Sequence, residues 1–249
     1  MSGHNRWSKI KHKKEATDAK KSKVWTKVIK EITVSARLGG GDPTANPRLR
    51  TAIDKAHAAN MTKDVIERSI KKGTGDLGDV NYEEFNYEVF GPGGSAMLVD
   101  IMTDNRNRTA SEIRNILTRL GGNLGASGSV GYMFKKLGVL VFDKSEVDEN
   151  ALTDQSIELG AEDIKAAGDA VTVFTEPREF ERIREGLKQA KLPVPVSAEV
   201  TMVAQTTVHL TGHDAEKAIK LISALEDSDD VQNVYSNIDV DDSVLESVG

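Results

Sequence analysis

The spacing of hydrophobic residues in this 249-residue chain changes at a Gly- and Asp-rich stretch covering residues 73–80. Before that stretch, apolar residues recur every three or four positions, which is the period of an amphipathic helix. The first apolar stripe predicts a long helix over residues 15–38 and consists of Trp25, Val28, Ile29, Ile32 and Ala36. The glycines at 39–41 would end it, and two more helices are expected, one after the pair Asn46-Pro47 and one over residues 62–73.

After residue 80 the apolar runs are short, and many alternate apolar with polar residues, as strands with one buried face do. The expected strands cover residues 82–90, 95–102, 130–134, 139–142, 171–175, 198–203 and 231–235. Helical patterns are found at residues 148–159, 180–190 and 214–225, and a capping box at Thr109–Glu112 opens a fourth helix. This alternation favours α+β sheets with helices on one face over a single large doubly wound sheet.

Charge is distributed unequally between the two parts of the chain. Residues 1–75 contain 18 Lys and Arg against 7 Asp and Glu, a net charge of +11, and the remaining 174 residues contain 15 against 32, a net charge of −17. Such asymmetry indicates a polyanion-binding module. The alternative is that the two parts neutralise each other by docking. We favour the binding interpretation because the basic residues are clustered in sequence as well as numerous.

The basic cluster consists of a tail and one face of the first predicted helix. Its candidate nucleic-acid-binding residues are Arg6, Lys9, Lys11, Lys13 and Lys14 in the tail and Lys20, Lys23, Lys27 and Lys30 in the helix. Lysine is a flexible point charge that suits phosphates more than base edges, and each phosphate contact releases counterions and strengthens binding. A solvated lysine face is the alternative, but it explains less well a basic tail that is continuous with the helix.

Two further polar segments are candidates for ligand contacts. Arg48 and Arg50 lie in the first turn of the second predicted helix, where backbone N–H groups favour phosphate, although pairing with Asp42 or Asp54 explains them equally well. A polar turn at the end of a predicted strand is a possible ligand turn, although Asx hydrogen bonds alone would also account for it. Its charged residues are Asp104, Arg106 and Arg108.

Several classes of function are excluded or disfavoured. The absence of cysteine excludes disulfides, thiolate zinc sites and a cysteine nucleophile. Of the five histidines only His209 and His213 are four residues apart, and Gly212 between them argues against a metal pair on a helix. We therefore expect no catalytic residues, no metal and no cofactor. No secretory signal and no apolar segment of roughly 20 residues is found, which indicates a cytoplasmic protein without a membrane partner.

A set of motifs spread along the chain is highly specific in combination. The motifs are Gly3–Lys14, Leu38–Pro43 followed by Asn46–Arg50, Tyr87–Gly94, Asp104–Thr109, and Gly121–Gly125 with Gly128–Val130. Together they closely resemble the YebC/PmpR family, and the similarity covers nearly the whole chain. The family has no established catalytic residues to carry over, and its basic N-terminal surface falls on the lysines between positions 9 and 27 named above.

The resemblance implies an α+β multidomain protein in which a three-helix domain is followed by two α+β domains, the third inserted into the second. The implied boundaries are residues 1–76 for the basic helical domain with its tail, 77–134 plus 206–243 for the discontinuous second domain, and 135–205 for the inserted one. Some family members are described as transcriptional regulators that bind DNA. Others are described as translation factors that act on the ribosome at proline-rich stretches.

The sequence thus predicts a nucleic-acid-binding regulatory protein and not an enzyme. The leading hypothesis is a transcriptional regulator that binds DNA through the basic N-terminal surface. The alternative is a ribosome-associated translation factor that contacts ribosomal RNA or tRNA to relieve stalling, and binding led by phosphates does not separate the two. A metal-dependent nuclease that uses Asp104 and the acidic cluster Asp227–Asp230 is a distant third. The pattern does not indicate an oligomeric state.

Overall fold

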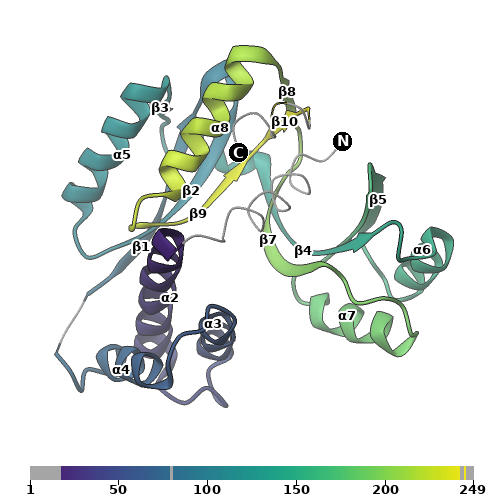
Figure 1. The fold of residues 1–249 in the computed structure, drawn as a ribbon, viewed down its shortest axis with the longest axis horizontal. Helices are drawn as coiled ribbons and strands as arrows, with labels where there is room; N and C mark the ends of the chain where they lie inside the picture. Colours follow the sequence, from purple (N-terminus) through teal and green to yellow (C-terminus); the bar gives the residue numbers. More distant parts are fainter. Residues whose placement is uncertain (1–17, 79–80, 242–243, 245–249) are drawn as a thin grey trace.

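A computed structural model describes residues 18–78, 81–241 and 244 of the chain. It has the expected α+β multidomain fold, in which an N-terminal three-helix domain lies below the second domain and beside the third in the view of Figure 1. The helices of the first domain are α2 (Asp18–Gly39), α3 (Pro47–Ala58) and α4 (Lys63–Thr74). The apolar stripe predicted from the sequence forms the core of this domain, because α2 packs against both α3 and α4.

Local chemistry explains where these helices end and how closely they approach. Asn46 caps α3 by accepting a hydrogen bond from the backbone N–H of Leu49 at 3.1 Å, and its side-chain amide donates to the carbonyl oxygens of Ser35 and Gly40. One asparagine therefore ties the end of α2 to the start of α3. A Cβ atom at Gly73 would lie 2.3 Å from the carbonyl oxygen of Thr33, so only glycine allows α2 and α4 to pack at this distance.

The second domain is a four-stranded antiparallel sheet covered on one face by two helices. The strand order is β3 (Asn123–Leu124), β1 (Glu83–Phe90), β2 (Ala96–Thr103) and β9 (Val231–Ser236). The covering helices are α5 (Arg106–Leu120) and α8 (Gly212–Glu226), and a short parallel pair, β8 (Val208–Leu210) and β10 (Ile238–Val240), lies beside them. Alternate residues of β2, namely Met97, Val99 and Ile101, are buried under the helices, as a period of two requires.

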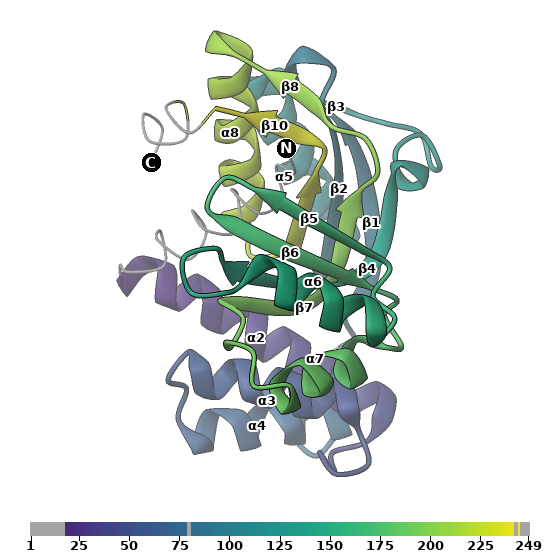
Figure 2. The same ribbon diagram turned by 90° about the vertical axis from the view of Figure 1, so that its right-hand side faces the viewer.

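The third domain is inserted between β3 and β8 and has its own sheet. Its strand order is β5 (Asp163–Ala167), β6 (Ala170–Thr175), β4 (Phe134–Asp143) and β7 (Ser197–Ala204), and all neighbours are antiparallel. Helices α6 (Glu149–Glu158) and α7 (Phe180–Gln189) pack on this sheet. Strands β4 and β7 run side by side into and out of the domain (Figure 2). Phe134 at the start of β4 belongs to the same hydrophobic cluster as Leu98 of β2, and this cluster joins the two domains.

Some elements differ from the sequence predictions. The capping box is wrong, because α5 begins at Arg106 with Asn105 as its N-cap, and Thr109 is a buried residue inside the helix. The strand expected over residues 130–134 is a 3-10 turn, Gly131–Met133, that leads directly into β4. The short strands β3, β5, β8 and β10 were not predicted. The first three residues of the helix predicted over 15–38 lie outside the described part, and the domain boundaries stay a prediction.

Candidate nucleic-acid interface

The predicted basic face of α2 lies against the turn that follows α8, residues 226–230. Lys23 Nζ forms an ion pair with Asp227 Oδ1 at 2.9 Å, and Lys27 Nζ donates a hydrogen bond to the backbone carbonyl oxygen of Glu226 at 2.7 Å. The carbonyl oxygens at the C-terminal end of a helix lack partners within the helix and carry partial negative charge. Lys23, Lys27 and Lys30 form the lysine row of α2. This row therefore docks the helical domain onto the C-terminal end of α8.

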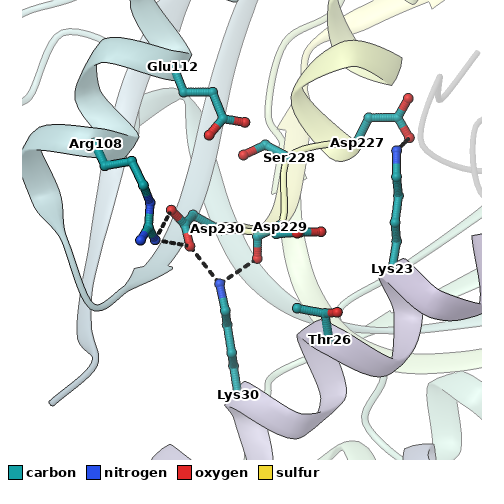
Figure 3. A pocket seen from close by; sticks show the side chains of 9 residues that line it. All are labelled: Lys23, Thr26, Lys30, Arg108, Glu112, Asp227, Ser228, Asp229 and Asp230. Atoms are coloured by element: carbon teal, nitrogen blue, oxygen red, sulfur yellow. Dashed lines mark hydrogen bonds and ion pairs between the residues drawn. The ribbon is translucent and has the colours of Figure 1, made fainter. Parts of the chain in front are cut away.

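Asp230 is the centre of this contact and is 3% exposed. Its carboxylate accepts from Lys30 Nζ at 2.6 Å and from Arg108 at 2.8 Å (Figure 3). It also accepts from the hydroxyls of Thr109 at 2.7 Å and Thr103 at 3.2 Å. Burial alone would raise the pKa of Asp230, but the hydrogen bonds from Lys30, Arg108 and Thr109 outweigh it and lower the pKa to about 2. Asp230 is thus an ionised buried carboxylate that joins α2, β2 and α5.

Lys30 is as enclosed as its partner. Its residue is 7% exposed, and its ammonium group also donates to the backbone carbonyl oxygens of Asp229 at 2.7 Å and Met102 at 3.4 Å. The same ammonium lies 5.8 Å from the centre of the Tyr82 ring. In this arrangement the ammonium group of Lys30 donates to three protein acceptors, which leaves no free donor for a phosphate group.

A cavity of about 430 Å³ lies at the same junction. Its lining residues, all drawn in Figure 3, are Lys23, Thr26, Lys30, Arg108, Glu112, Asp227, Ser228, Asp229 and Asp230. Carboxylates and cations are almost equally frequent in this set, and each of its cations is paired with a carboxylate, so the cavity does not favour a polyanion. No group of three or more His, Cys, Asp or Glu that could hold a metal ion occurs within the described residues.

Arg48 and Arg50, the candidates at the start of α3, have different environments. The guanidinium of Arg48 bridges Glu31 of α2 at 2.8 Å and Glu84 of β1 at 2.5 Å, and these hydrogen bonds raise its pKa above the ordinary value. Neither arginine pairs with Asp42, which accepts hydrogen bonds from Thr44 instead. Arg50 is exposed, and no ion pair to it is recorded within the described part of the chain.

The possible ligand turn, formed by Asp104, Arg106 and Arg108, is the N-terminus of α5. Arg108 donates to Asp104 at 2.8 Å as well as to Asp230, which places this turn in the same contact as Lys30. Arg106 forms an ion pair with Glu83 at 3.4 Å, and its guanidinium lies 4.2 Å from the centre of the Phe85 ring. These contacts connect the first turn of α5 to the sheet and to Asp230.

The remaining candidates lie at or beyond the limit of the described residues. Arg6, Lys9, Lys11, Lys13 and Lys14 precede residue 18, and Lys20 is described only as part of the helical backbone of α2. Sequence reasoning also missed the role of Asp230, because the acidic cluster was considered as part of a possible nuclease site. The available signal was charge complementarity: an acid-rich turn and a lysine-rich helix in one chain. Nothing in the spacing specified that they meet.

Comparison with known proteins assigns the chain to a protein family. A family model described as the TACO1/YebC protein N-terminal domain matches residues 5–76, and a model of the TACO1/YebC second and third domain matches residues 82–238. A protein from Geotalea uraniireducens named "Probable transcriptional regulatory protein" is 56% identical over 248 residues and covers 100% of both chains. A protein with the same name from Desulfatibacillum aliphaticivorans is 53% identical and covers 98% of this chain and 99% of its own.

A solved structure agrees with these relationships. The crystal structure of a conserved hypothetical protein from Aquifex aeolicus has a TM-score of 0.77 and 44% sequence identity, covering 90% of this chain and 93% of the other. The fold and the matches define a three-domain α+β protein with a basic helical domain docked on an acidic body. The chain belongs to the TACO1/YebC family, as its resemblance to YebC/PmpR proteins predicted. Within the described residues, no helix is long and apolar enough to cross a membrane.

Proposed function

We propose that this protein is a regulator without catalytic activity that binds nucleic acid through its basic tail and helical domain, with DNA and transcription as the leading target. The proposal depends mainly on the net charge of +11 on residues 1–75, which are followed by a body of net charge −17. The relatives that share more than half of the sequence are named as transcriptional regulatory proteins, which agrees with this proposal.

Docking narrows the surface that would meet phosphate. The lysine row of α2 is occupied by the turn 226–230, so the contacts fall to the tail and to the exposed cations of α3 and α4. Apart from Arg48, which is paired with Glu31 and Glu84, those cations are Arg50, Lys55, Lys63, Arg68 and Lys71. They are scattered over two helices and are mostly lysines, which suits backbone contacts more than base readout. Phosphate contacts of this kind fit a folded RNA as well, so a ribosomal target is the second candidate.

The test is a mobility-shift titration of the full chain at several salt concentrations, with promoter DNA and with ribosomal RNA. Changing Lys9, Lys11, Lys13 and Lys14 to Ala should weaken binding. The slope of log affinity against log salt concentration should become smaller by about four units, since each phosphate contact contributes about 0.9 to this slope. A matched variant removes four exposed cations of the third domain. These are Lys144, Lys165, Arg184 and Lys188.

The outcomes separate the candidates. Binding to DNA that depends on the tail and not on the third-domain cations supports the transcriptional target. Cosedimentation with ribosomes, with the same dependence and without DNA binding, supports the translation factor. The absence of binding to either polymer at low salt would overturn the proposal.

A further inference from the structure

Helix α5 presents an unusual surface for a helix in an acidic body. Its sequence, RNRTASEIRNILTRL, contains four arginines and a single acid, Glu112. Ile113, Ile116 and Leu117 are buried against the sheet and α8, and the opposite face of the helix is exposed. In Figure 1 α5 lies at the outer edge of the molecule, on the side opposite to the third domain.

Two of the four arginines have a structural explanation and two do not. Arg106 and Arg108 hold the first turn, through Glu83 and Asp230. Arg114 and Arg119 are exposed, and no ion pair to either is recorded among the described residues. None of the positions three or four residues away from them is acidic, so pairing within the helix does not explain them.

Helix α7 shows what an ordinary charged helix surface in this protein looks like. Arg182 pairs with Glu179 at 2.5 Å and Arg184 with Glu181 at 2.7 Å, each three residues apart. Lys188 lies 3.6 Å from Glu185 in the same register. The cations of α7 are therefore neutralised locally and stabilise their own helix. The last two arginines of α5 lack such partners, which leaves their guanidinium groups available to an external anion.

The remaining exposed positions of α5 point the same way. Apart from the acid Glu112, they are Asn107, Ser111, Asn115 and Thr118. Asparagine, serine and threonine are poorer helix formers than the Glu, Lys or Ala that commonly fill exposed helix positions. Residues of low helix propensity at exposed helix positions often mark a functional site. These short side chains, together with arginine, are common donors to phosphate oxygens in protein–nucleic acid contacts.

Helical geometry places Arg114 and Arg119 on the two sides of the short polar side chains, an arrangement called the clasp below. Arg114 and Arg119 are five residues apart, which separates them by about 140° around the helix and roughly 7.5 Å along its axis. Asn107, Ser111 and Thr118 lie between the two arginines on the outward face, by the same 3.6-residue period. A guanidinium on each side of a stripe of short polar groups can contact two phosphates of one backbone while that backbone lies along the helix.

We propose that the outward face of α5 is a second nucleic-acid contact surface, in which Arg114 and Arg119 bind backbone phosphates and the short polar side chains lie under the strand. This inference rests on the proposed function and adds a surface in the second domain to the basic N-terminal one. Charge complementarity selects the occupant, because a phosphodiester chain supplies the bidentate anions that the described part of the protein does not supply to these arginines.

The test compares two variants of the full chain with equal charge change. Arg114→Gln combined with Arg119→Gln removes the clasp, and Arg184→Gln combined with Lys188→Gln removes two cations of α7. Mobility shifts with a duplex and with a ribosomal RNA fragment would be titrated from 50 to 200 mM salt. The α5 variant should bind at least tenfold more weakly at low salt, with a salt slope smaller by about two units for duplex DNA. The α7 variant should bind like the wild type, and the α5 variant should keep the wild-type melting temperature.

Each other outcome is informative. If the α5 variant binds like the α7 variant while the wild type binds tightly, the inference is wrong and the proposed function stands. If the wild type binds neither polymer, both fail. A second copy of this acidic chain is the competing occupant of the arginine face. Loss of self-association in sedimentation, with nucleic-acid affinity unchanged, would therefore assign the face to that contact and overturn the inference.

Discussion

The lysine row of α2 and the arginine face of α5 are both basic helix surfaces, but the fold uses them in opposite ways. Lys23, Lys27 and Lys30 are directed at the turn after α8, and the last of them is buried against Asp230. Arg114 and Arg119 are directed at solvent. The more conspicuous charge run in the sequence therefore holds domains together, while the less conspicuous one, within an acidic region, is left available.

This difference shows that net charge and accessible charge are separate properties. Residues 1–75 are strongly basic, yet some of their cations are paired with carboxylates and helix carbonyl oxygens of the body. The body is strongly acidic, yet one of its helices exposes cations. A polyanion responds to accessible charge, because exposed groups release counterions on contact and buried pairs do not. Three predictions test whether the α2 contact is the rigid structural device that this comparison requires.

The largest effect is expected from Asp230→Ala. The substitution leaves the ammonium of Lys30 buried without its carboxylate and removes the acceptor of Arg108 and Thr109. Removing one partner of a buried ion pair typically costs about 3–5 kcal/mol of unfolding free energy. Chemical denaturation of the variant should show a loss in this range. Asp227→Ala, which removes a carboxylate from the exposed end of the same turn, is the matched control.

A second substitution makes this prediction sharper. Adding Lys30→Met to Asp230→Ala removes the orphaned charge and should recover part of the lost stability, because the main penalty is an uncompensated buried cation. A loss for Asp230→Ala no greater than that for Asp227→Ala would contradict the assignment of Lys30 and Asp230 as a structural contact. The lysine row of α2 would then be open to the same role as the face of α5.

Acid should weaken the same contact by an intermediate amount. The pKa of Asp230 is lowered from 3.8 to about 2 in the folded protein, so its ionised form stabilises the fold above the unfolded pKa. That contribution, about 2 kcal/mol from the size of the shift, is lost as the pH falls from about 4 to 2. The wild type should therefore lose more stability over this range than Asp230→Asn, measured by denaturation at each pH. Parallel profiles for the two proteins would exclude Asp230 as the group responsible.

Local structure was predictable from the sequence wherever a short-range rule decides it. The cap at Asn46, the apolar stripe of α2 and the strands β1 and β2 follow from neighbouring residues. The same kind of rule failed at Thr109. Two N-cap candidates lie four residues apart there, and the buried hydrogen bond of Thr109 to Asp230 favours Asn105 as the cap. Local patterns cannot rank competing caps when a residue 121 positions away decides between them.

The contact of α2 with the body could not be predicted for the same reason. Lys30 and Asp230 are 200 residues apart, and the lysine row alone is equally compatible with phosphate, water or carboxylate as its partner. The arginine face of α5 was also overlooked, because Arg114 and Arg119 are dispersed among apolar residues and lie in an acidic region. Only the burial of Ile113 and Leu117 on the other side of α5 reveals that the two arginines share an exposed surface.

The smallest effect is expected from Lys23→Ala, at the exposed end of the α2 contact. The side chains of Lys23 and Asp227 are 41% and 63% exposed, so solvent screens their 2.9 Å ion pair. Exposed pairs of this kind contribute about 0.2–1 kcal/mol, and added salt reduces the contribution further. Denaturation of Lys23→Ala at low and high salt should show a small loss that disappears in high salt. A large loss that does not depend on salt would show that the rigid contact extends from Lys30 to this end of the helix, leaving no part of the lysine row free to exchange a carboxylate for a phosphate.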